Sequence, residues 1–443
     1  MKFGTDGVRG VANSELTAEF ALRLGRAAAI VLASAADRPL VVIGGDTRES
    51  TPMLDAALSA GFAAEGVRVV RLGVAPTPMV AFEAQRRGAV GAMVSASHNP
   101  FADNGIKLFA AGGSKLTDEV ERRIEAQLDV MMSPSAAPAP IVSETSAHGA
   151  YLDHVLSVLD GRRLDGLSVV VDVANGAAFE VAAEALGAAG ADVTVIAASP
   201  TGTNINAGCG ATVPSFVAET VRARGADLGV ALDGDADRLI AVDHTGAVVD
   251  GDHIIAIAAE DLRARGRLRH DTVVVTVMTN LGFRLAMRDA GIDVVETGVG
   301  DRYVLEALAA GGFSLGGEQS GHVIFADHAT TGDGLLTSLV LLDAVKRSGR
   351  SLAELATGAM TSLPQVLVNV RVPERVPDFG HEVAERLADD ISEVEQQLGD
   401  TGRVLVRPSG TEPLIRVMVE ASSAEQAQAA ADGLATAAHR HFG

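Results

Sequence analysis

Three carboxylates at alternate positions, Asp233, Asp235 and Asp237, lie between two short apolar runs of the chain. In one tight loop such groups repel one another unless a cation lies among them. Oxygen ligands suit Mg²⁺ or Ca²⁺ rather than zinc, and an EF-hand is excluded because its sixth position, glycine in that motif, is Arg238 here. Three protein oxygens leave coordination positions open, as is usual where Mg²⁺ binds beside a phosphate. The spacing therefore predicts a magnesium site, with a solvated acidic hairpin as the alternative.

Ser97 is the second candidate, within the sequence Ser-Ala-Ser-His-Asn-Pro at residues 95–100. The apolar run before it, residues 89–94, is typical of a buried strand, and Pro100 favours a turn directly afterwards. A serine on a loop that leaves a buried strand is held by a rigid scaffold and is open to a ligand. An ordinary exit from a strand is the alternative. Lys107 follows closely, and because the chain has only four lysines, its position favours a functional role.

A third motif has the parts of a phosphate-binding loop. Arg407 and Arg416 flank a turn that contains glycine and two hydroxyl residues, and guanidinium groups offer phosphate paired hydrogen-bond donors. Backbone amides of such a turn add further donors. The loop residues that we expect to contact phosphate are Ser409, Gly410 and Thr411.

Two further motifs are weak when taken alone. Glu318 and Ser320 alternate, so in an extended segment both side chains would point the same way, where they suit the hydroxyl groups of a sugar. Arg9 lies in a glycine-rich loop near the start of the chain. Neither a Walker A pattern nor a convincing dinucleotide fingerprint is present, which leaves nucleotide binding without support. Ser97 lacks a nucleophile-elbow pattern, so a serine hydrolase is not favoured.

The composition limits the class of protein. A chain of 443 residues is expected to form several domains, and a net charge of −21 argues against nucleic acid or an anionic membrane as a partner. The single cysteine, Cys209, excludes an intrachain disulfide and favours a reducing compartment. No apolar run approaches the roughly 18 residues that span a bilayer. We therefore expect a cytoplasmic protein.

Apolar runs alternate with helical stretches through about the first 360 residues, which predicts α/β domains with mainly parallel sheets. After a break near residues 364–377, two alternating runs and a polar Ala-rich helix predict a smaller α+β domain. We expect domains at 1–150, 151–252, 253–365 and 366–443. Predicted strands are 40–43, 67–72, 90–94, 168–173, 192–196, 228–232, 272–277, 293–297, 403–407 and 414–420. Predicted helices include 17–32, 52–65, 179–189 and 214–224, and residues 131–140 are expected to form a loop.

Taken together and in this order, the motifs resemble the α-D-phosphohexomutase superfamily over the whole chain. The resemblance implies three similar α/β domains with mixed sheets and a smaller C-terminal α+β domain around a central cleft. It implies that Ser97 is a phosphoserine and that Mg²⁺ is bound by the three aspartates and a phosphoserine oxygen. It also implies a phosphoryl-transfer site, sugar contacts and a grip on the non-reacting phosphate. The residues implied are Arg9, His98, Lys107 and Arg238 at the transfer site, His322 or Lys107 for protons, Glu318 and Ser320 for sugar hydroxyls, and the loop 407–416 for phosphate.

Three segments resemble the branch of this superfamily that interconverts the 6- and 1-phosphates of glucosamine and supplies amino-sugar nucleotide synthesis. They are residues 4–10, residues 204–210 and Gln319 within the sequence Gly-Glu-Gln-Ser-Gly-His. Ala211 departs from the branch, which commonly has a hydroxyl residue there. The resemblance further implies a hexose 1,6-bisphosphate activator and a homodimer. The alternatives are the same chemistry on mannose or glucose phosphates, a sugar-phosphate phosphatase, and a non-catalytic sugar-phosphate sensor.

Overall fold

The computed structural model describes residues 2–4, 7–33, 38–128, 130, 133–134, 137–372, 379–408 and 413–443. Its internal contacts divide the chain into two compact units. The first unit comprises Met1–Met278 and Gly291–Ala359, and the second comprises Thr279–Ala290 and Met360–Gly443. Of the four sheets that the described residues form, the first unit contains three and the second contains the fourth.

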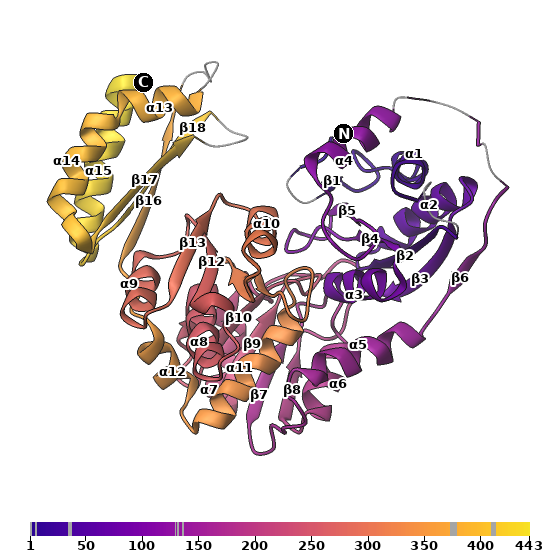
Figure 1. The fold of residues 1–443 in the computed structure, drawn as a ribbon, viewed down its shortest axis with the longest axis horizontal. Coiled ribbons are helices and arrows are strands. Elements are labelled where there is room, and N and C mark those ends of the chain that lie inside the picture. The colour runs from indigo at the N-terminus through magenta and orange to yellow at the C-terminus, as the bar shows by residue number, and fades with distance from the viewer. Residues whose placement is uncertain are drawn as a thin grey trace. The chain divides into compact units, whose positions relative to one another are not determined.

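The first sheet has six strands in the order β1-β5-β4-β2-β3-β6. Strands β2, β3, β4 and β6 are mutually parallel, and β1 and β5 run antiparallel to their neighbours. Figure 1 shows α1 and α2 on one face of this sheet and α3 on the other. The elements are β1 (Val8–Val11), α1 (Ala18–Ala28), a π-helical turn (Ala29–Ala33), β2 (Leu40–Gly45), α2 (Thr51–Ala64), β3 (Arg68–Val74), α3 (Thr77–Arg87), β4 (Val90–Val94), β5 (Asp103–Phe109), α4 (Asp118–Leu128) and β6 (Ile141–Ser143).

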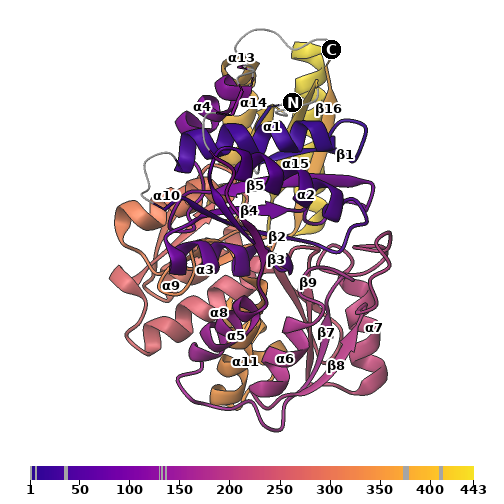
Figure 2. The same ribbon diagram turned by 90° about the vertical axis from the view of Figure 1, so that its right-hand side faces the viewer.

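The second sheet has the order β11-β10-β9-β7-β8, with α6 and α7 on opposite faces (Figure 2). The third has the order β13-β12-β14-β15. The elements that form the second sheet or lie next to it in the chain are α5 (Ser146–Ser157), β7 (Ser168–Asp172), α6 (Val181–Ala188), β8 (Asp192–Ile196), α7 (Pro214–Arg224), β9 (Leu228–Leu232), β10 (Leu239–Asp243) and β11 (Val248–Val249). Elements of the third are α8 (Gly251–Ala264), β12 (Thr272–Thr276), β13 (Asp293–Thr297), α10 (Asp301–Gly311), β14 (Leu315–Gly317), β15 (Val323–Phe325), α11 (Gly334–Ser348) and α12 (Leu352–Ala359), with a 3₁₀ turn at Arg269–Asp271.

These three sheets share one plan. In each, three parallel strands are followed by a fourth strand that pairs antiparallel with the third, giving the orders β3-β2-β4-β5, β8-β7-β9-β10 and β13-β12-β14-β15. The connection into the antiparallel strand carries the Ser97 loop in the first sheet, the aspartate loop in the second and Glu318 in the third. The mixed sheets that the resemblance implied are confirmed.

The second unit is a three-stranded antiparallel sheet in the order β16-β18-β17, packed with helices. Glu420 on β18 is fully buried and accepts hydrogen bonds from Leu281 N at 2.9 Å and from the side chain of Asn280 at 3.3 Å. This carboxylate joins α9 to the sheet. The elements are α9 (Leu281–Asp289), β16 (Gln365–Arg371), α13 (Phe379–Arg386), α14 (Ala388–Leu398), a 3₁₀ turn (Gly399–Thr401), β17 (Arg403–Pro408), β18 (Leu414–Glu420) and α15 (Ala424–Phe442).

Local sequence patterns located these elements well. The predicted strands 90–94, 192–196, 228–232 and 293–297 have the observed limits, as does the helix 214–224. The helix predicted at 17–32 differs, because its last turn is π-helical from Ala29 onwards. Within 131–140, residues 131, 132, 135 and 136 lie outside the described residues, and the others form neither helix nor strand. The predicted domain limits stay a prediction. None of the described helices is long and apolar enough to cross a membrane.

Candidate active site

Ser97 lies on the loop between β4 and β5 and is buried. Its backbone has a φ of 53°, a left-handed conformation that costs a residue with a Cβ roughly 1–2 kcal/mol. Its Oγ donates a 2.5 Å hydrogen bond to Oδ2 of Asp233 and lies 3.3 Å from Nδ1 of His98. The structure therefore brings the predicted serine directly to the predicted metal-binding aspartates.

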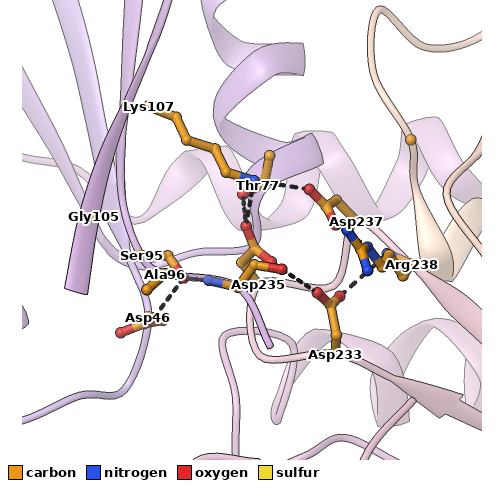
Figure 3. A network of polar contacts seen from close by, with 12 residues as sticks. Asp46, Thr77, Ser95, Ala96, Gly105, Lys107, Asp233, Asp235, Asp237 and Arg238 are labelled. Carbon is orange, nitrogen blue, oxygen red and sulfur yellow. Dashed lines mark hydrogen bonds and ion pairs between the residues drawn. The ribbon is translucent and has the colours of Figure 1, made fainter. Parts of the chain in front are cut away.

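The aspartate loop joins β9 to β10, and one carboxylate oxygen from each of Asp233, Asp235 and Asp237 lies within 4.8 Å of the other two. All three residues are buried. Figure 3 shows this cluster with Lys107 reaching it from β5. Oδ1 of Asp235 and Oδ1 of Asp237 are buried without a hydrogen-bond partner among the described residues. Because an unpaired buried carboxylate oxygen is costly, the cluster fits a divalent cation with oxygen ligands.

Positive charge from the first part of the chain balances part of this cluster. Nζ of Lys107 lies 3.0 Å from Oδ2 of Asp235 and 2.9 Å from Oδ2 of Asp237. Thr77, the first residue of α3, donates from Oγ1 to Asp235 at 2.6 Å. Burial opposes ionisation of Asp237, but Lys107 and His322 hold its pKa well below the ordinary range. Burial, followed by repulsion from Asp237 and Asp235, raises the pKa of Asp233 well above that range. A divalent cation among the three carboxylates would offset this repulsion.

Two histidines and two arginines surround the same loops. Nδ1 of His322 lies 3.7 Å from Asp237, and its Nε2 lies 3.6 Å from Asp301 and accepts a hydrogen bond from Gly332 N at 3.1 Å. Burial, Arg238 and Arg9 lower the pKa of His98. Arg9 donates to the carbonyl of Ala96 at 3.5 Å, and Arg238 N donates to Asp233 at 3.2 Å. The predicted members of the transfer site thus gather around Ser97 and the three aspartates.

Glu318 and Ser320 are close together, although not through an extended segment. β14 ends at Gly317, and Gly321 N donates to the carbonyl of Glu318 at 3.0 Å, which closes a turn. Ser320 Oγ lies 3.5 Å from Oε2 of Glu318, while Oε1 accepts from Gly300 N at 3.1 Å. The extended geometry considered for this pair is therefore wrong, because the antiparallel return into β15 needs a turn at this point. The turn still leaves Ser320 exposed and Glu318 half-buried.

The arginines of the phosphate-binding motif lie in the second unit. Arg407 on β17 and Arg416 on β18 are opposite each other in the antiparallel register, so their side chains share one face of the sheet. Burial and the neighbouring Arg416 lower the pKa of Arg407. Two like charges held opposite each other favour an anion as the third member. Ser409, Gly410 and Thr411 lie outside the described residues.

Residues that the sequence analysis did not single out support the Ser97 loop. Arg48 is fully buried, forms an ion pair with Asp46, and donates from Nη2 to the carbonyls of Ser97 and Asn99. For Asp46 and Arg48 the only signal in the sequence is position, because both closely follow the apolar strand 40–45, as Ser97 follows 90–94. Thr77 was also missed.

The comparisons with known proteins agree with this geometry. The four domain families of phosphoglucomutase/phosphomannomutase match in order, with α/β/α domain I at residues 1–133, domain II at 149–246, domain III at 250–363 and the C-terminal domain at 367–437. The chain belongs to the phosphoglucomutase/phosphomannomutase family and is an enzyme of the phosphohexomutase class.

Within that family, curated relatives that are 52–55% identical to this chain are phosphoglucosamine mutases. The protein of Streptomyces griseus is 54% identical, covering 98% of this chain and 97% of its own, and that of Frankia casuarinae is 55% identical with the same coverage. Two solved structures share the fold. A family protein of Burkholderia thailandensis has a TM-score of 0.82 at 24% identity, covering 99% of this chain and 97% of its own. N-acetylphosphoglucosamine mutase of Aspergillus fumigatus, in complex with GlcNAc-6P and magnesium, has a TM-score of 0.71 at 20% identity, with coverages of 100% and 96%. The resemblance predicted from the motifs is confirmed.

Proposed function

We propose that this enzyme interconverts glucosamine 6-phosphate and glucosamine 1-phosphate through a phosphoserine at Ser97 and a glucosamine 1,6-bisphosphate intermediate. The observation that carries the proposal is the 2.5 Å contact between Ser97 Oγ and an aspartate cluster in which two buried carboxylate oxygens accept no hydrogen bond from the described residues. The substrate follows from the phosphoglucosamine mutases that are 52–55% identical to the chain. The product would supply amino-sugar nucleotide synthesis.

Asp233, Asp235 and Asp237 would hold Mg²⁺ together with a phosphate oxygen on Ser97. The ion would supply positive charge that offsets the negative charge of the transferring phosphoryl group. The magnesium named with the Aspergillus enzyme supports this choice of ion. Lys107 would stay paired with Asp235 and Asp237 at 3.0 and 2.9 Å and so keep the cluster close to neutral.

In the first transfer, the free hydroxyl oxygen of the sugar phosphate attacks the phosphorus of phospho-Ser97. The bond between phosphorus and Ser97 Oγ breaks, Oγ takes up a proton, and the hydroxyl proton of the sugar passes to a base. His322 and Lys107 are the candidates for this proton transfer, and Lys107, an ammonium paired with two aspartates, could take the sugar proton only after giving its own to Ser97 Oγ. The bisphosphate then turns around, Ser97 Oγ loses its proton and attacks the other phosphorus, and the sugar oxygen leaves with a proton. This second transfer restores the phosphoserine and releases glucosamine 1-phosphate. Phosphoryl transfer depends mainly on position and charge, and Arg9, His98 and Arg238 surround the loop where the charge develops.

Turning the intermediate requires contacts that accept the sugar in both orientations. Glu318 and Ser320 would bind hydroxyl groups common to both orientations. Arg407 and Arg416, with Ser409, Gly410 and Thr411, would bind whichever phosphate is not reacting. A hexose 1,6-bisphosphate would restore phosphate to Ser97 whenever it is lost. We place the enzyme in the cytoplasm, because a chain with a single cysteine forms no intrachain disulfide and suits a reducing compartment.

Parallel assays of three substrates test this proposal. Protein primed with glucose 1,6-bisphosphate in Mg²⁺ is given glucosamine 6-phosphate, glucose 6-phosphate or mannose 6-phosphate, and each 1-phosphate is followed. We expect the highest kcat/KM with the amino sugar. A preference for glucose or mannose would move the substrate to the sister branch, and release of free phosphate without any 1-phosphate would indicate a phosphatase.

A further inference from the structure

Asn206 reaches the Ser97 loop from the other side of the site. It lies between β8 and α7, and its Nδ2 donates to the carbonyl of Ser97 at 2.9 Å and to that of Asn99 at 3.1 Å. Its backbone has a φ of 57°, a conformation that asparagine tolerates better than most residues. The other amide orientation would point Oδ1 at two carbonyl oxygens, so the hydrogen bonds fix which atom faces the loop.

Arg48 binds the same two carbonyls from the loop between β2 and α2. Its Nη2 lies 3.2 Å from the oxygen of Ser97 and 2.6 Å from that of Asn99. Asp46 orients this guanidinium, and Oδ2 of Asp46 also accepts from Ser95 Oγ at 2.5 Å. A carbonyl oxygen accepts two hydrogen bonds, and each of the two nitrogens has two hydrogens to donate. The two carbonyls are thus saturated by one residue from each side.

Gly234 leaves the space for this arrangement. A Cβ built on Gly234 would lie 2.5 Å from the oxygen of Ser97 and 2.9 Å from Nδ2 of Asn206. Gly234 stands between the metal-binding Asp233 and Asp235, so a side chain here would separate the aspartate loop from the Ser97 loop. The loops that carry Ser97, Asn206 and Gly234 therefore approach one another closely at the carbonyl of Ser97.

We propose that Asn206 and Arg48 are positioning residues for phosphoryl transfer, which together hold the strained Ser97 backbone so that its phosphate meets the cation and the sugar hydroxyl. The proposal rests on the phosphoserine function proposed above. Neither residue needs to touch the substrate. Their effect is on alignment, and a displacement of about 1 Å at a reacting centre can cost on the order of 100-fold in rate.

Asn206→Gly and Asn206→Asp separate the effect of the Asn206 side-chain hydrogen bonds from that of its backbone conformation. Glycine keeps the positive φ and removes the amide, whereas aspartate keeps the shape and turns an acceptor toward two carbonyl oxygens. Asn204→Ala is the matched control, because Asn204 lies on the same loop and its side chain bonds only to Thr201 and Ser199 in the described structure. Arg48→Lys tests the other side, since lysine keeps the charge but not the fork.

The assay measures kcat and KM for glucosamine 6-phosphate with each variant primed to full Ser97 phosphorylation, and the ³¹P NMR shift of phospho-Ser97. We expect kcat to fall about 10-fold for Asn206→Gly and about 100-fold for Asn206→Asp, with KM within twofold, a moved ³¹P shift, and no change for Asn204→Ala. Wild-type kcat in phosphorylated, folded Asn206→Gly would overturn the positioning role, as would an equal loss in Asn204→Ala. Wild-type protein that turns over without phosphate on Ser97 would instead overturn the phosphoserine function. If Asn206→Asp fails to fold, Asn206→Gly and Arg48→Lys decide the question.

Discussion

The hydroxyl group of Ser97 donates a 2.5 Å hydrogen bond to Oδ2 of Asp233, a residue 136 positions further along the chain. Both residues lie on connections between a parallel strand and the antiparallel strand that follows it, in two sheets with the same strand order. The repeated plan therefore brings equivalent loops of successive sheets together. The third such connection carries Glu318 and Ser320, so one topological position carries the proposed nucleophile, the proposed metal ligands and the proposed sugar contacts.

Replacing Ser97 separates its chemistry from its backbone strain. Ser97→Ala and Ser97→Gly both remove the hydroxyl, so we expect neither to give measurable mutase turnover. Because φ is 53°, glycine relieves a cost of roughly 1–2 kcal/mol that alanine keeps, partly offset by the greater entropy of glycine in the unfolded chain. Thermal unfolding should show Ser97→Gly more stable than Ser97→Ala by about 1 kcal/mol. Near-normal turnover in either variant would refute the phosphoserine role.

The aspartate cluster should make stability depend on Mg²⁺. A cation that binds only the folded protein stabilises it by about 2.7 kcal/mol at 100 times its Kd. Asp235→Asn should weaken Mg²⁺ binding at least 10-fold, measured by calorimetry, and reduce the Mg²⁺-dependent rise in Tm. Asp243→Asn is the control, since Asp243 is also buried on this hairpin but accepts from Thr245 and Ala247 instead. Equal Mg²⁺ affinity in Asp235→Asn and wild type would contradict the metal assignment.

The charge of Arg416 should lower the free energy of unfolding and at the same time favour binding of the substrate phosphate. It faces Arg407 across the strand pair, and removing one of two opposed like charges stabilises a sheet by about 0.5 kcal/mol. Arg416→Gln should therefore raise Tm slightly. It should also raise KM for glucosamine 6-phosphate about 10-fold, because the substrate phosphate loses one hydrogen bond from a charged group.

Arg403→Gln is the matched control for Arg416. Arg403 lies on β17 and binds both oxygens of the buried Glu420, at 2.9 and 3.0 Å. Breaking this pair should cost about 3 kcal/mol, so Tm should fall while KM changes little. An unchanged KM in Arg416→Gln would remove Arg416 from the phosphate site.

Local patterns predicted what depends on neighbours in sequence. The strand 228–232 and the three aspartates after it could be recognised because apolar residues and repelling carboxylates are adjacent in the chain. Asn206 and Thr77 could not be assigned a role, since their partners are Ser97, 109 positions away, and Asp235, 158 positions away. In the sequence, Asn206 stands out only as a member of the segment 204–210, which resembles the glucosamine phosphate branch. The turn at Glu318 was missed for the same reason, because only the pairing of β14 with β15 requires it.

Asp333, the N-cap of α11, gives a pH dependence whose sign is fixed by burial. Its carboxylate accepts from Leu336 N and from Tyr151 Oη, both at 2.9 Å, yet burial raises its pKa from 3.8 to about 6. A raised folded-state pKa means that the stability gained from the neutral carboxyl is present below pH 3.8 and is lost as the pH rises through 6. Asn in its place stays neutral throughout.

The comparison is therefore the unfolding free energy of wild type and Asp333→Asn in urea at pH 5 and pH 8. Wild type should lose about 1.5 kcal/mol relative to Asp333→Asn over this interval. Asp343→Asn on the same helix is the control: against the effect of burial, Arg162 and Arg347 lower the pKa of Asp343, so it is ionised in both states and its difference from wild type should stay constant. A difference between wild type and Asp333→Asn that does not change with pH would show that Asp333 is charged in the folded protein at pH 5, and that Tyr151 and the helix amides outweigh its burial.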